Sequence, residues 1–269
     1  MKIEIIIPTI NLWTQYTKPA LDTVFEAMVR AKAHEFNCHV LLIDNASTDS
    51  TQAEAAKLEG ELLHYQRNND MWGFQKTVNF GVAYAWEHGA DFALILNNDI
   101  VLHSEAIWRL AQRMAKGDVG MATCMDVAGE MKENKIPPQD IARLLAQDKE
   151  SVDEAPHPCF SAFMISKKCW DEVGEFDEGF APAYFEDNDY HWRTQQIGML
   201  AIVYPPAMFY HYASRTQNEA MGFQLVNSYM FLRNRDYYVK KWGGTPGAEK
   251  FSVPFDDAKL SIKYTKQKP

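Results

Sequence analysis

Four short apolar runs near the start of the chain alternate with segments of helical periodicity, and this alternation limits the possible folds more than any other feature. The runs cover residues 3–7, 40–43, 62–65 and 92–96, and the pattern between them predicts helices over 18–35, 50–58 and 74–88. Strands that alternate with helices form parallel sheets with right-handed crossovers. We therefore expect an α/β fold in which this part of the chain builds a parallel sheet.

A loop rich in polar residues follows each apolar run. These loops contain Pro8, Thr9, Asn11, Asp44, Asn69, Asn97, Asn98 and Asp99. Because the carboxyl ends of parallel strands meet at one edge of a sheet, we expect these residues to gather there, where open α/β sheets bind their ligands. Amide and carboxylate oxygens suit a hard divalent cation and a phosphate-bearing ligand better than zinc. A polar turn that merely ends the strand is the alternative for residues 97–99.

Two common nucleotide-binding motifs are missing from the sequence. No GxGxxG follows the first predicted strand and no GxxxxGK[ST] occurs, which argues against a dinucleotide-binding domain and a P-loop NTPase. A nucleotide would have to be held by side chains and a metal ion instead. The net charge of −9 does not favour nucleic-acid binding, although it allows a local basic patch.

The second half of the chain is less regular. The pattern predicts helices over 104–115 and 167–173 and strands over 119–124, 160–165 and 200–203, and an apolar run over 208–210 leads into His211. Residues 126–156 are charged and predict a surface excursion with a helix over 138–147. A long amphipathic helix is expected over 218–242, followed by a lysine-rich, mobile tail over 259–269.

Three carboxylates lie within four residues at Glu186, Asp187 and Asp189. Such crowding is electrostatically costly unless a cation or a proton transfer makes use of it. Acidic residues in the first turn of a helix, which gain from the helix dipole, are the structural alternative. A single histidine after an apolar run, such as His211, is more often structural than a ligand.

Several segments, in this order and spacing, resemble a family 2 glycosyltransferase of GT-A fold, and most of all its rhamnosyltransferase-like branch. They are PT at 8–9, LLIDNASTD at 41–49, NFG at 79–81, LNND at 96–99, VGEFD at 173–177, FEDNDYHWR at 185–193 and the histidine at 211. The resemblance covers about residues 3–215. It implies a Rossmann-like, mostly parallel central sheet flanked by helices, with a C-terminal helical extension.

The resemblance also implies a division of the chain. Residues 1–102 would be the nucleotide-sugar-binding half and 103–215 the acceptor-binding and catalytic half of one GT-A domain, with the C-terminal helix and basic tail in 216–269.

Roles for single residues follow from the same resemblance. Asp187 would be the catalytic base, with Glu186 and Asp189 beside it, and Asp99 and His211 would bind Mn²⁺ or Mg²⁺. The nucleotide would be bound by Pro8, Thr9, Asn11, Asp44, Asn69, Asn97, Asn98 and Arg193. Asn97 replaces the first Asp of the family's DxD motif, which removes one negative charge and weakens the expected need for metal. The loop 69–73 is bulkier than the usual glycine-rich form, so this chain departs from the family pattern at the donor-sugar pocket.

The implied activity is an inverting, metal-dependent transfer of a sugar from a UDP- or dTDP-sugar to a hydroxyl acceptor, with surface or cell-wall glycan as the default acceptor. One alternative acceptor is a hydroxylated modified nucleobase in DNA, favoured by a basic face of Arg233, Arg235, Lys240, Lys241 and the tail lysines. Another alternative is a GT-A-like domain that binds nucleotide or glycan without turnover.

The sequence also predicts a cytoplasmic location. The four cysteines show no metal-ligand spacing and suggest reduced thiols. We expect no signal segment, and no apolar run approaches the ~20 residues that cross a bilayer.

Overall fold

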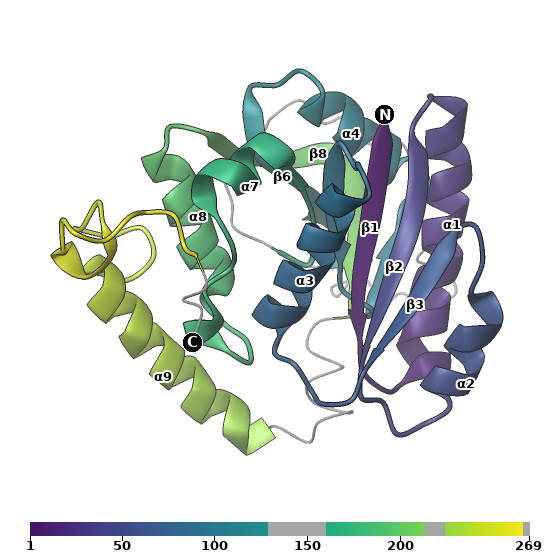
Figure 1. Cartoon of the computed structure of the whole chain (residues 1–269), viewed down its shortest axis with the longest axis horizontal. Coiled ribbons are helices and arrows are strands. Elements are labelled where there is room, and N and C mark those ends of the chain that lie inside the picture. The colour runs from purple at the N-terminus through teal and green to yellow at the C-terminus, as the bar shows by residue number, and fades with distance from the viewer. Residues whose placement is uncertain (129–159, 213–223, 266–269) are drawn as a thin grey trace.

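A computed structural model describes residues 1–128, 160–212 and 224–265, with side chains from 229 onward in the last segment. Its centre is an eight-stranded sheet in the order β3-β2-β1-β4-β7-β6-β8-β5, with helices on both faces (Figure 1). The strands are β1 (Lys2–Thr9), β2 (Asn37–Asn45), β3 (Leu63–Asn68), β4 (Phe92–Leu96), β5 (Ile100–Leu102), β6 (Val119–Asp126), β7 (Ala162–Ser166) and β8 (Leu200–His211). The main helices are α1 (Lys18–Ala33), α2 (Thr51–Ala55), α3 (Phe74–Glu87), α4 (Ala106–Met114), α7 (Lys167–Val173), α8 (Glu186–Gln196) and α9 (Gln224–Trp242).

The first four strands form the predicted parallel sheet. β1 pairs with both β2 and β4, and β2 pairs with β3, all in parallel. The register sets Thr9 opposite Asp44 at the carboxyl ends of β1 and β2. The loops that were expected to gather at one edge therefore do so.

The second half turns the sheet into a mixed one that is still mostly parallel. β7 runs antiparallel between β4 and β6, while β6 and β8 are parallel. The short strand β5, which the sequence did not predict, pairs antiparallel with the end of β8.

β1 and β8 run past the ends of their predicted ranges, 3–7 and 200–203, and include the prolines that follow. β1 continues through Pro8 to Thr9, and β8 is one strand from Leu200 to His211. In β8 the register with β6 jumps from Tyr204 to Met208, so Pro205 and Pro206 lie in an irregularity where no ladder bond to β6 is needed.

Both faces of the sheet are covered, which explains the continuous apolar runs. Residues of α1 and α4 share one core with Ile3, Ile5 and Ile7, whereas α3 and α7 share the other with Ile6. The first of these cores contains residues from both predicted halves of the domain. In α1, Met28 is buried in this core whereas the next residue, Val29, is 71% exposed.

Helix α9 packs outside α8 and away from the sheet (Figure 1). Its Tyr238 and Trp242 share a buried cluster with Phe180 and Phe185. The tail is held through Tyr264, whose backbone N–H donates to the carbonyl of Val173 at 3.1 Å, so the expectation of a mobile tail is wrong for this part. The predicted excursion 126–156 and its helix fall almost wholly outside the described residues, as do 218–223 and the last lysines. Among the helices that the structure does describe, none has the length and apolar character needed to cross a membrane.

Candidate active site

Asn98 ties the end of β4 to the loop after β1. Its amide nitrogen donates to the hydroxyls of Thr9 and Thr17, both at 3.1 Å, and those two oxygens lie 2.7 Å apart. All three side chains are buried. Thr9 and Asn98 therefore stabilise the loops at this edge of the sheet. Thr17 takes part in the same hydrogen bonds, and the sequence analysis missed it.

Asp44 is fully buried at the end of β2 and both of its oxygens are engaged. Oδ1 accepts from the backbone N–H of Ser47 at 2.8 Å, and Oδ2 accepts from the Tyr65 hydroxyl at 2.6 Å and the Arg67 guanidinium at 3.1 Å. The side chain of Arg67 is 31% exposed, so it is the charged partner that faces solvent here. Asp44 therefore organises the loop after β2, and its own contact with the nucleotide stays a prediction.

Asn11 joins the loops that follow β1 and β2. Its backbone N–H donates to Ser47 Oγ at 2.7 Å, and its side-chain oxygen accepts from the backbone N–H of Thr48 at 2.7 Å. Asn11 has a left-handed φ of 52°, which the side-chain bonds hold in place. Pro8 lies partly exposed at the same edge.

Asp99 and His211 meet at this edge of the sheet, although they were predicted from distant motifs. His211 Nε2 lies 3.2 Å from Asp99 Oδ1, and the Asn97 amide nitrogen lies 3.4 Å from the same ring atom. Asp99 is 3% exposed. The pairing of Ile100 with His211 in β5 and β8 brings the two residues together.

This pair fits a divalent cation. A carboxylate and an imidazole are ligands that Mn²⁺ accepts, and phosphate oxygens and water complete its shell in nucleotide sites. Among the described residues, no group of three or more His, Cys, Asp and Glu could hold a metal ion. Asp99 and His211 would therefore hold the ion together with a bound diphosphate rather than by themselves.

The first turn of α8 lies at the same end of the molecule. The backbone N–H of Phe74, at the start of α3, donates to the carbonyl of Pro182 at 3.1 Å, and Gln75 donates to the carbonyl of Phe180 at 3.3 Å. Because α3 begins just beyond the carboxyl end of β3, these bonds place the segment before α8 at the ligand edge (Figure 1). Asn69 lies exposed in the turn between β3 and α3.

Glu186 and Asp187 open α8 as a pair of partly buried carboxylates. The backbone before them is left-handed, with φ of 78° at Tyr184 and 69° at Phe185. Asp187 Oδ1 accepts from the backbone N–H of Asn188 at 2.8 Å, whereas Glu186 Oε2 is buried with no hydrogen-bond partner among the described residues.

The two carboxylates are held at different pKa values. Burial raises the pKa of Asp187 to about 6, and burial together with the charge of Asp187 raises the pKa of Glu186 to about 8. The charge of Asp187 thus favours the protonated form of Glu186, so the pair holds one negative charge more readily than two. Such a pair suits proton transfer, because one member can accept a proton at physiological pH.

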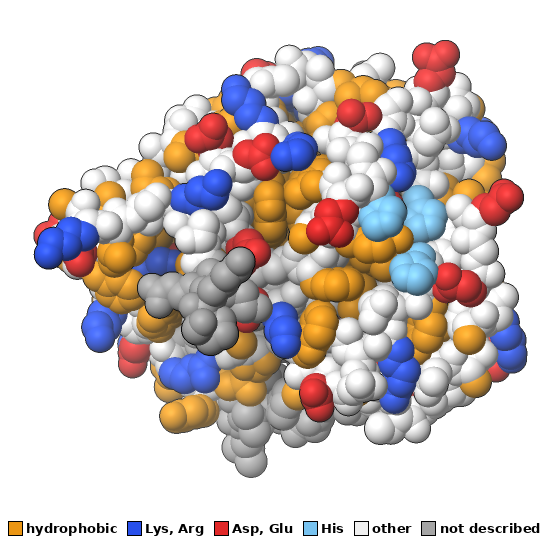
Figure 2. All heavy atoms as spheres, in the orientation of Figure 1, with side chains coloured by type: hydrophobic (Ala, Val, Ile, Leu, Met, Phe, Trp, Pro, Cys, Tyr) orange, Lys and Arg blue, Asp and Glu red, His pale blue; other side chains and the backbone are white. Residues whose placement is uncertain are grey.

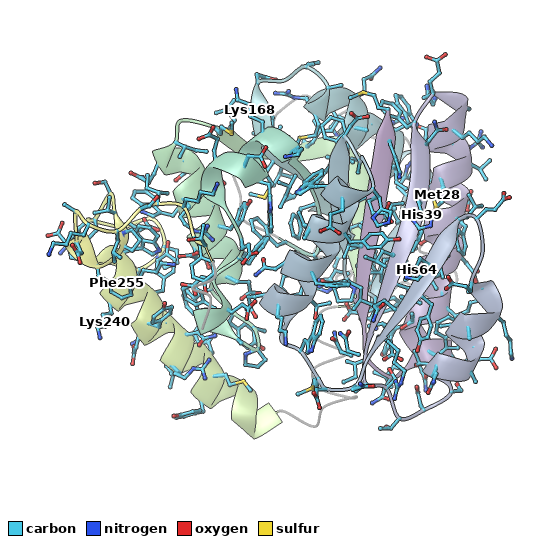
Figure 3. The ribbon with its side chains drawn as sticks, viewed as in Figure 1. Met28, His39, His64, Lys168, Lys240 and Phe255 are labelled. Atoms are coloured by element: carbon cyan, nitrogen blue, oxygen red, sulfur yellow. The ribbon has the colours of Figure 1, made fainter. Side chains whose placement is uncertain are left out.

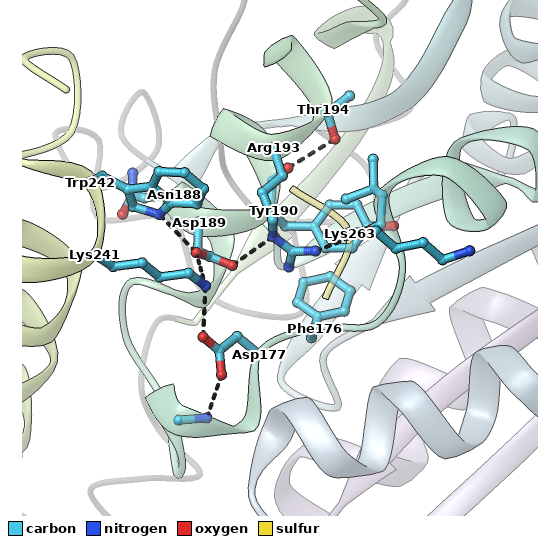
Figure 4. A network of polar contacts seen from close by, with 12 residues as sticks. Phe176, Asp177, Asn188, Asp189, Tyr190, Arg193, Thr194, Lys241, Trp242 and Lys263 are labelled. Atoms are coloured by element: carbon cyan, nitrogen blue, oxygen red, sulfur yellow. Dashed lines mark hydrogen bonds and ion pairs between the residues drawn. The ribbon is translucent and has the colours of Figure 1, made fainter. Parts of the chain in front are cut away.

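Asp189 was predicted as a catalytic residue and Arg193 as a nucleotide-binding one, and the structure places both in the interior. Both side chains are fully buried, and Arg193 Nε donates to Asp189 Oδ2 at 2.9 Å (Figure 4). Burial acts to raise the pKa of Asp189, but the charges of Lys241 and Arg193 outweigh it and hold that pKa below its usual value. Asp189 is thus an anchored anion rather than a base, and Arg193 offers no exposed surface to a diphosphate.

The histidines visible in Figure 2 gather away from this edge. His39 and His64 start β2 and β3 near the amino ends of the strands, and His64 stacks on Tyr84 (Figure 3). His39 Nδ1 lies 2.6 Å from Glu4 Oε1, and His64 Nδ1 lies 2.9 Å from Glu59 Oε1. Glu4, which is buried, and Glu59, which is exposed, account for these two imidazoles, and His211 is the histidine that lies beside Asp99.

Comparison with known proteins points to one family. A family model described as "Glycosyl transferase family 2" matches residues 4–174. A dTDP-rhamnosyl transferase, RfbF of Shigella flexneri, is 24% identical over 218 residues, which cover 77% of this chain and 72% of the relative. A galactofuranosyl glycosyltransferase of Leishmania donovani is 31% identical over 106 residues, 39% of this chain and 24% of the relative.

Solved structures share the fold at low identity. The mannosyltransferase PcManGT of Pyrobaculum calidifontis, in complex with GDP-Man and Mn²⁺, has a TM-score of 0.63 at 15% identity and covers 91% of this chain and 66% of its own. GalNAc-T7 with UDP, GalNAc and Mn²⁺ has a TM-score of 0.59 at 16% identity, over 78% of this chain and 43% of its own. These likenesses show the GT-A fold.

Proposed function

The chain belongs to glycosyl transferase family 2 and uses nucleotide sugars, and from this we propose that it is an inverting, metal-dependent transferase with a UDP- or dTDP-sugar donor and a hydroxyl acceptor. The observation that carries the proposal is the contact of 3.2 Å between Asp99 and His211 at the carboxyl end of β4. An oxygen and a nitrogen ligand so placed suit a cation that binds the diphosphate of the donor.

Donor recognition would be divided along the edge of the sheet. Asp99 and His211 would hold Mn²⁺ or Mg²⁺, which neutralises charge on the departing diphosphate. Asn97 would approach the ribose, and the pocket organised by Thr9, Asn11 and Asp44 would take a pyrimidine base. The name of the Shigella relative supports a dTDP-linked donor, whereas two structural neighbours contain GDP-Man and UDP.

Asp187 would act as the general base. Ionised at neutral pH, it would take the proton from the acceptor hydroxyl while that oxygen attacks the anomeric carbon. The bond from this carbon to the diphosphate oxygen breaks, and its electron pair leaves with the nucleoside diphosphate. The transition state would resemble an oxocarbenium ion, as in glycoside hydrolysis. A general base contributes about 10²–10⁴-fold to such a step.

We propose a hydroxyl of a surface or cell-wall glycan as the acceptor, as the rhamnosyltransferase-like branch implies. For the DNA alternative, the structure removes one residue from the expected basic face, whereas Arg233, Arg235 and Lys240 stay exposed. Lys241 is buried in an ion pair with Asp177, and Arg233 donates to the backbone carbonyl of Ala181.

The first experiment is isothermal titration with UDP and with dTDP, each with Mn²⁺ and then with EDTA. We expect binding that EDTA abolishes or weakens at least about tenfold. Turnover is then followed as release of nucleoside diphosphate from dTDP-rhamnose, UDP-GalNAc and GDP-mannose, with water as the acceptor of the sugar. Absence of binding to every nucleotide would reject the proposal and favour a site that does not turn over sugar nucleotides.

The base is tested by Asp187→Asn. This variant should lose about 10²-fold or more in kcat and keep its affinity for the nucleotide. Retention of most of the activity would remove Asp187 from its assigned role.

A further inference from the structure

Lys241, in the last turn of α9, is buried between two carboxylates. Its Nζ lies 2.7 Å from Asp177 Oδ2 and 2.6 Å from Asp189 Oδ1, and the side chain is 3% exposed (Figure 4). A buried lysine is costly unless it is paired and hydrogen-bonded. Lys241 satisfies this condition because Asp177 and Asp189, which lie outside α9, both contact its ammonium group.

The other contacts of Asp189 complete a balanced network. The Trp242 indole N–H donates to Asp189 Oδ1 at 2.9 Å, and Arg193 Nε donates to Asp189 Oδ2 at 2.9 Å. Asp177 and Asp189 carry two negative charges, and Lys241 and Arg193 carry two positive ones. Removal of one member leaves a buried charge without compensation, whereas removal of an opposite pair keeps the balance.

The network is part of the turn that carries the proposed base. Asp189 lies two residues after Asp187, and its backbone N–H donates to the Phe185 carbonyl at 3.0 Å in the first turn of α8. Because Lys241 and Trp242 of α9 bind the side chain of Asp189, α9 holds the first turn of α8 in place. The negative charge of Asp189 also acts on the carboxyl of Glu186 and contributes to its raised pKa.

We propose that Lys241 is a positioning residue for the transfer reaction: through Asp189 it orients the first turn of α8 and offsets the negative charge beside the Glu186–Asp187 pair. This inference rests on the proposed function, in which Asp187 is the base. It assigns a task to α9, which lies beyond the segment matched by the family model.

The groups that face the carboxylate pair come from several elements. They are Asp189 of α8, Tyr238 of α9, Tyr184 before α8 and the neutral Gln75 of α3, while Lys241 and Arg193 act on Asp189 itself. Of these, Lys241 and Asp189 can be changed to neutral residues of similar size without touching Asp99 or His211. They are therefore the best positions for a test.

The test is the pH dependence of kcat/KM for the release of nucleoside diphosphate from dTDP-rhamnose, or from whichever donor of the panel turns over. Lys241→Met leaves excess negative charge. It should therefore move the acidic limb of the pH profile, the range over which the rate falls as the pH is lowered, to higher pH. Asp189→Asn leaves excess positive charge and should move it to lower pH. We expect shifts on the order of half a pH unit or more, and the double variant should lie close to wild type.

Matched controls separate positioning from simple loss of folding. Lys240 is the exposed neighbour of Lys241 on the outer side of α9 (Figure 3), so Lys240→Met makes the same change without breaking the network. It should leave the pH profile unchanged. In Lys241→Met, kcat should fall while the KM for the donor stays the same, because the donor site is untouched.

The outcomes are distinct. Opposite shifts in the two single variants, reversed in the double variant, support the inference. If the acidic limbs of the two single variants stay in place, or move in the same direction, the inference is wrong. If Lys241→Met does not fold, Asp189→Asn and the charge-balanced double variant decide. Full activity of Asp187→Asn would refute the proposed base itself, which is a separate failure.

Discussion

The imidazole Nε2 of His211 lies 3.2 Å from Oδ1 of Asp99, although the two residues are 112 positions apart in the chain. The strand β5 starts directly after Asp99 and pairs with the end of β8, so that Ile100 lies opposite His211. The backbone N–H of Tyr212 also donates to the Asp99 carbonyl at 3.0 Å. The pair is therefore fixed by main-chain pairing as well as by its side chains.

His211→Ala should lose metal-dependent nucleotide binding. Removal of the imidazole takes away one of two protein ligands, so we expect the Kd for UDP or dTDP in Mn²⁺ to rise at least about tenfold, while the affinity in EDTA stays as in wild type. Isothermal titration measures both. The control is His88→Ala, because His88 is exposed directly after the carboxyl-terminal end of α3 and away from Asp99. Equal loss of affinity with and without metal would mean that His211 contacts the nucleotide directly.

The sequence predicted the strands of the first half because each is a local apolar run bounded by polar residues. It did not predict β5, since three residues carry too little periodicity and the pairing partner lies far along the chain. The proximity of Asp99 and His211 followed from the family resemblance alone. No pattern within either segment encodes it.

The same limit explains Asp189 and Arg193. Their spacing of four residues allows an ion pair on one helix face, and this signal was available in the sequence. Their full burial was not, because it depends on Lys241 and Trp242, which follow Asp189 by 52 and 53 positions. The sequence therefore allowed both a functional and a structural interpretation of Asp189 and Arg193, and only the packing of α9 supports the structural one.

The rate of the wild-type enzyme should fall in mildly acidic solution. Burial raises the pKa of Asp187 to about 6, and the base must be ionised to accept a proton. We expect the acidic limb of kcat/KM to have its midpoint near that pH rather than near ~4, the value of an ordinary aspartate. Initial rates across a pH series measure it. A midpoint near that of an ordinary aspartate would show that the base is an exposed carboxylate.

Glu186→Gln should stabilise the protein in alkaline solution. The pKa of Glu186 is raised to about 8 in the folded protein, so folding favours the protonated form. That advantage is complete at pH values below the ordinary pKa of a glutamate and is lost as the pH rises to the folded value. The amide avoids the buried charge, and we expect Tm to exceed wild type by about 3 °C near pH ~9, with little difference near pH ~4.

Thermal unfolding at the two pH values checks this result. Glu87→Gln, at an exposed position in the last turn of α3, is the control and should change Tm at neither pH. A gain that is the same at both pH values would trace the effect to something other than the ionisation of Glu186.

Asn234→Ala should slow turnover without weakening donor binding. The buried Asn234 amide donates from α9 to the carbonyls of Phe180 at 2.6 Å and Ala183 at 2.7 Å, just before the left-handed residues that open α8. Loss of these bonds should cost about 1–3 kcal/mol of stability and let the turn shift. Because small displacements of reacting groups are costly, kcat should fall at least about tenfold with an unchanged Kd for the nucleotide.

The exposed neighbour Arg235 provides the matched control for that change. Arg235→Ala should keep both kcat and Tm. If Asn234→Ala lowered Tm but left kcat as in wild type, its amide would serve folding and not the geometry of the carboxylate pair.

Gly81→Ala should destabilise the protein by separating α3 from the sheet. A Cβ at this position would lie 2.5 Å from Cγ2 of Ile6 and 3.2 Å from Cδ1 of Ile43, both in the core. β-branched residues in a packed sheet cannot yield by that distance, so overpacking should cost about 1–3 kcal/mol. Denaturant unfolding measures the loss. Gly60→Ala is the control, since a Cβ there meets only a carbonyl oxygen at 4.0 Å, and it should be neutral within about 0.5 kcal/mol.

Because α3 also holds the segment before α8 through Phe74 and Gln75, Gly81→Ala should lower kcat as well. An unchanged kcat would show that this segment is held mainly by α9.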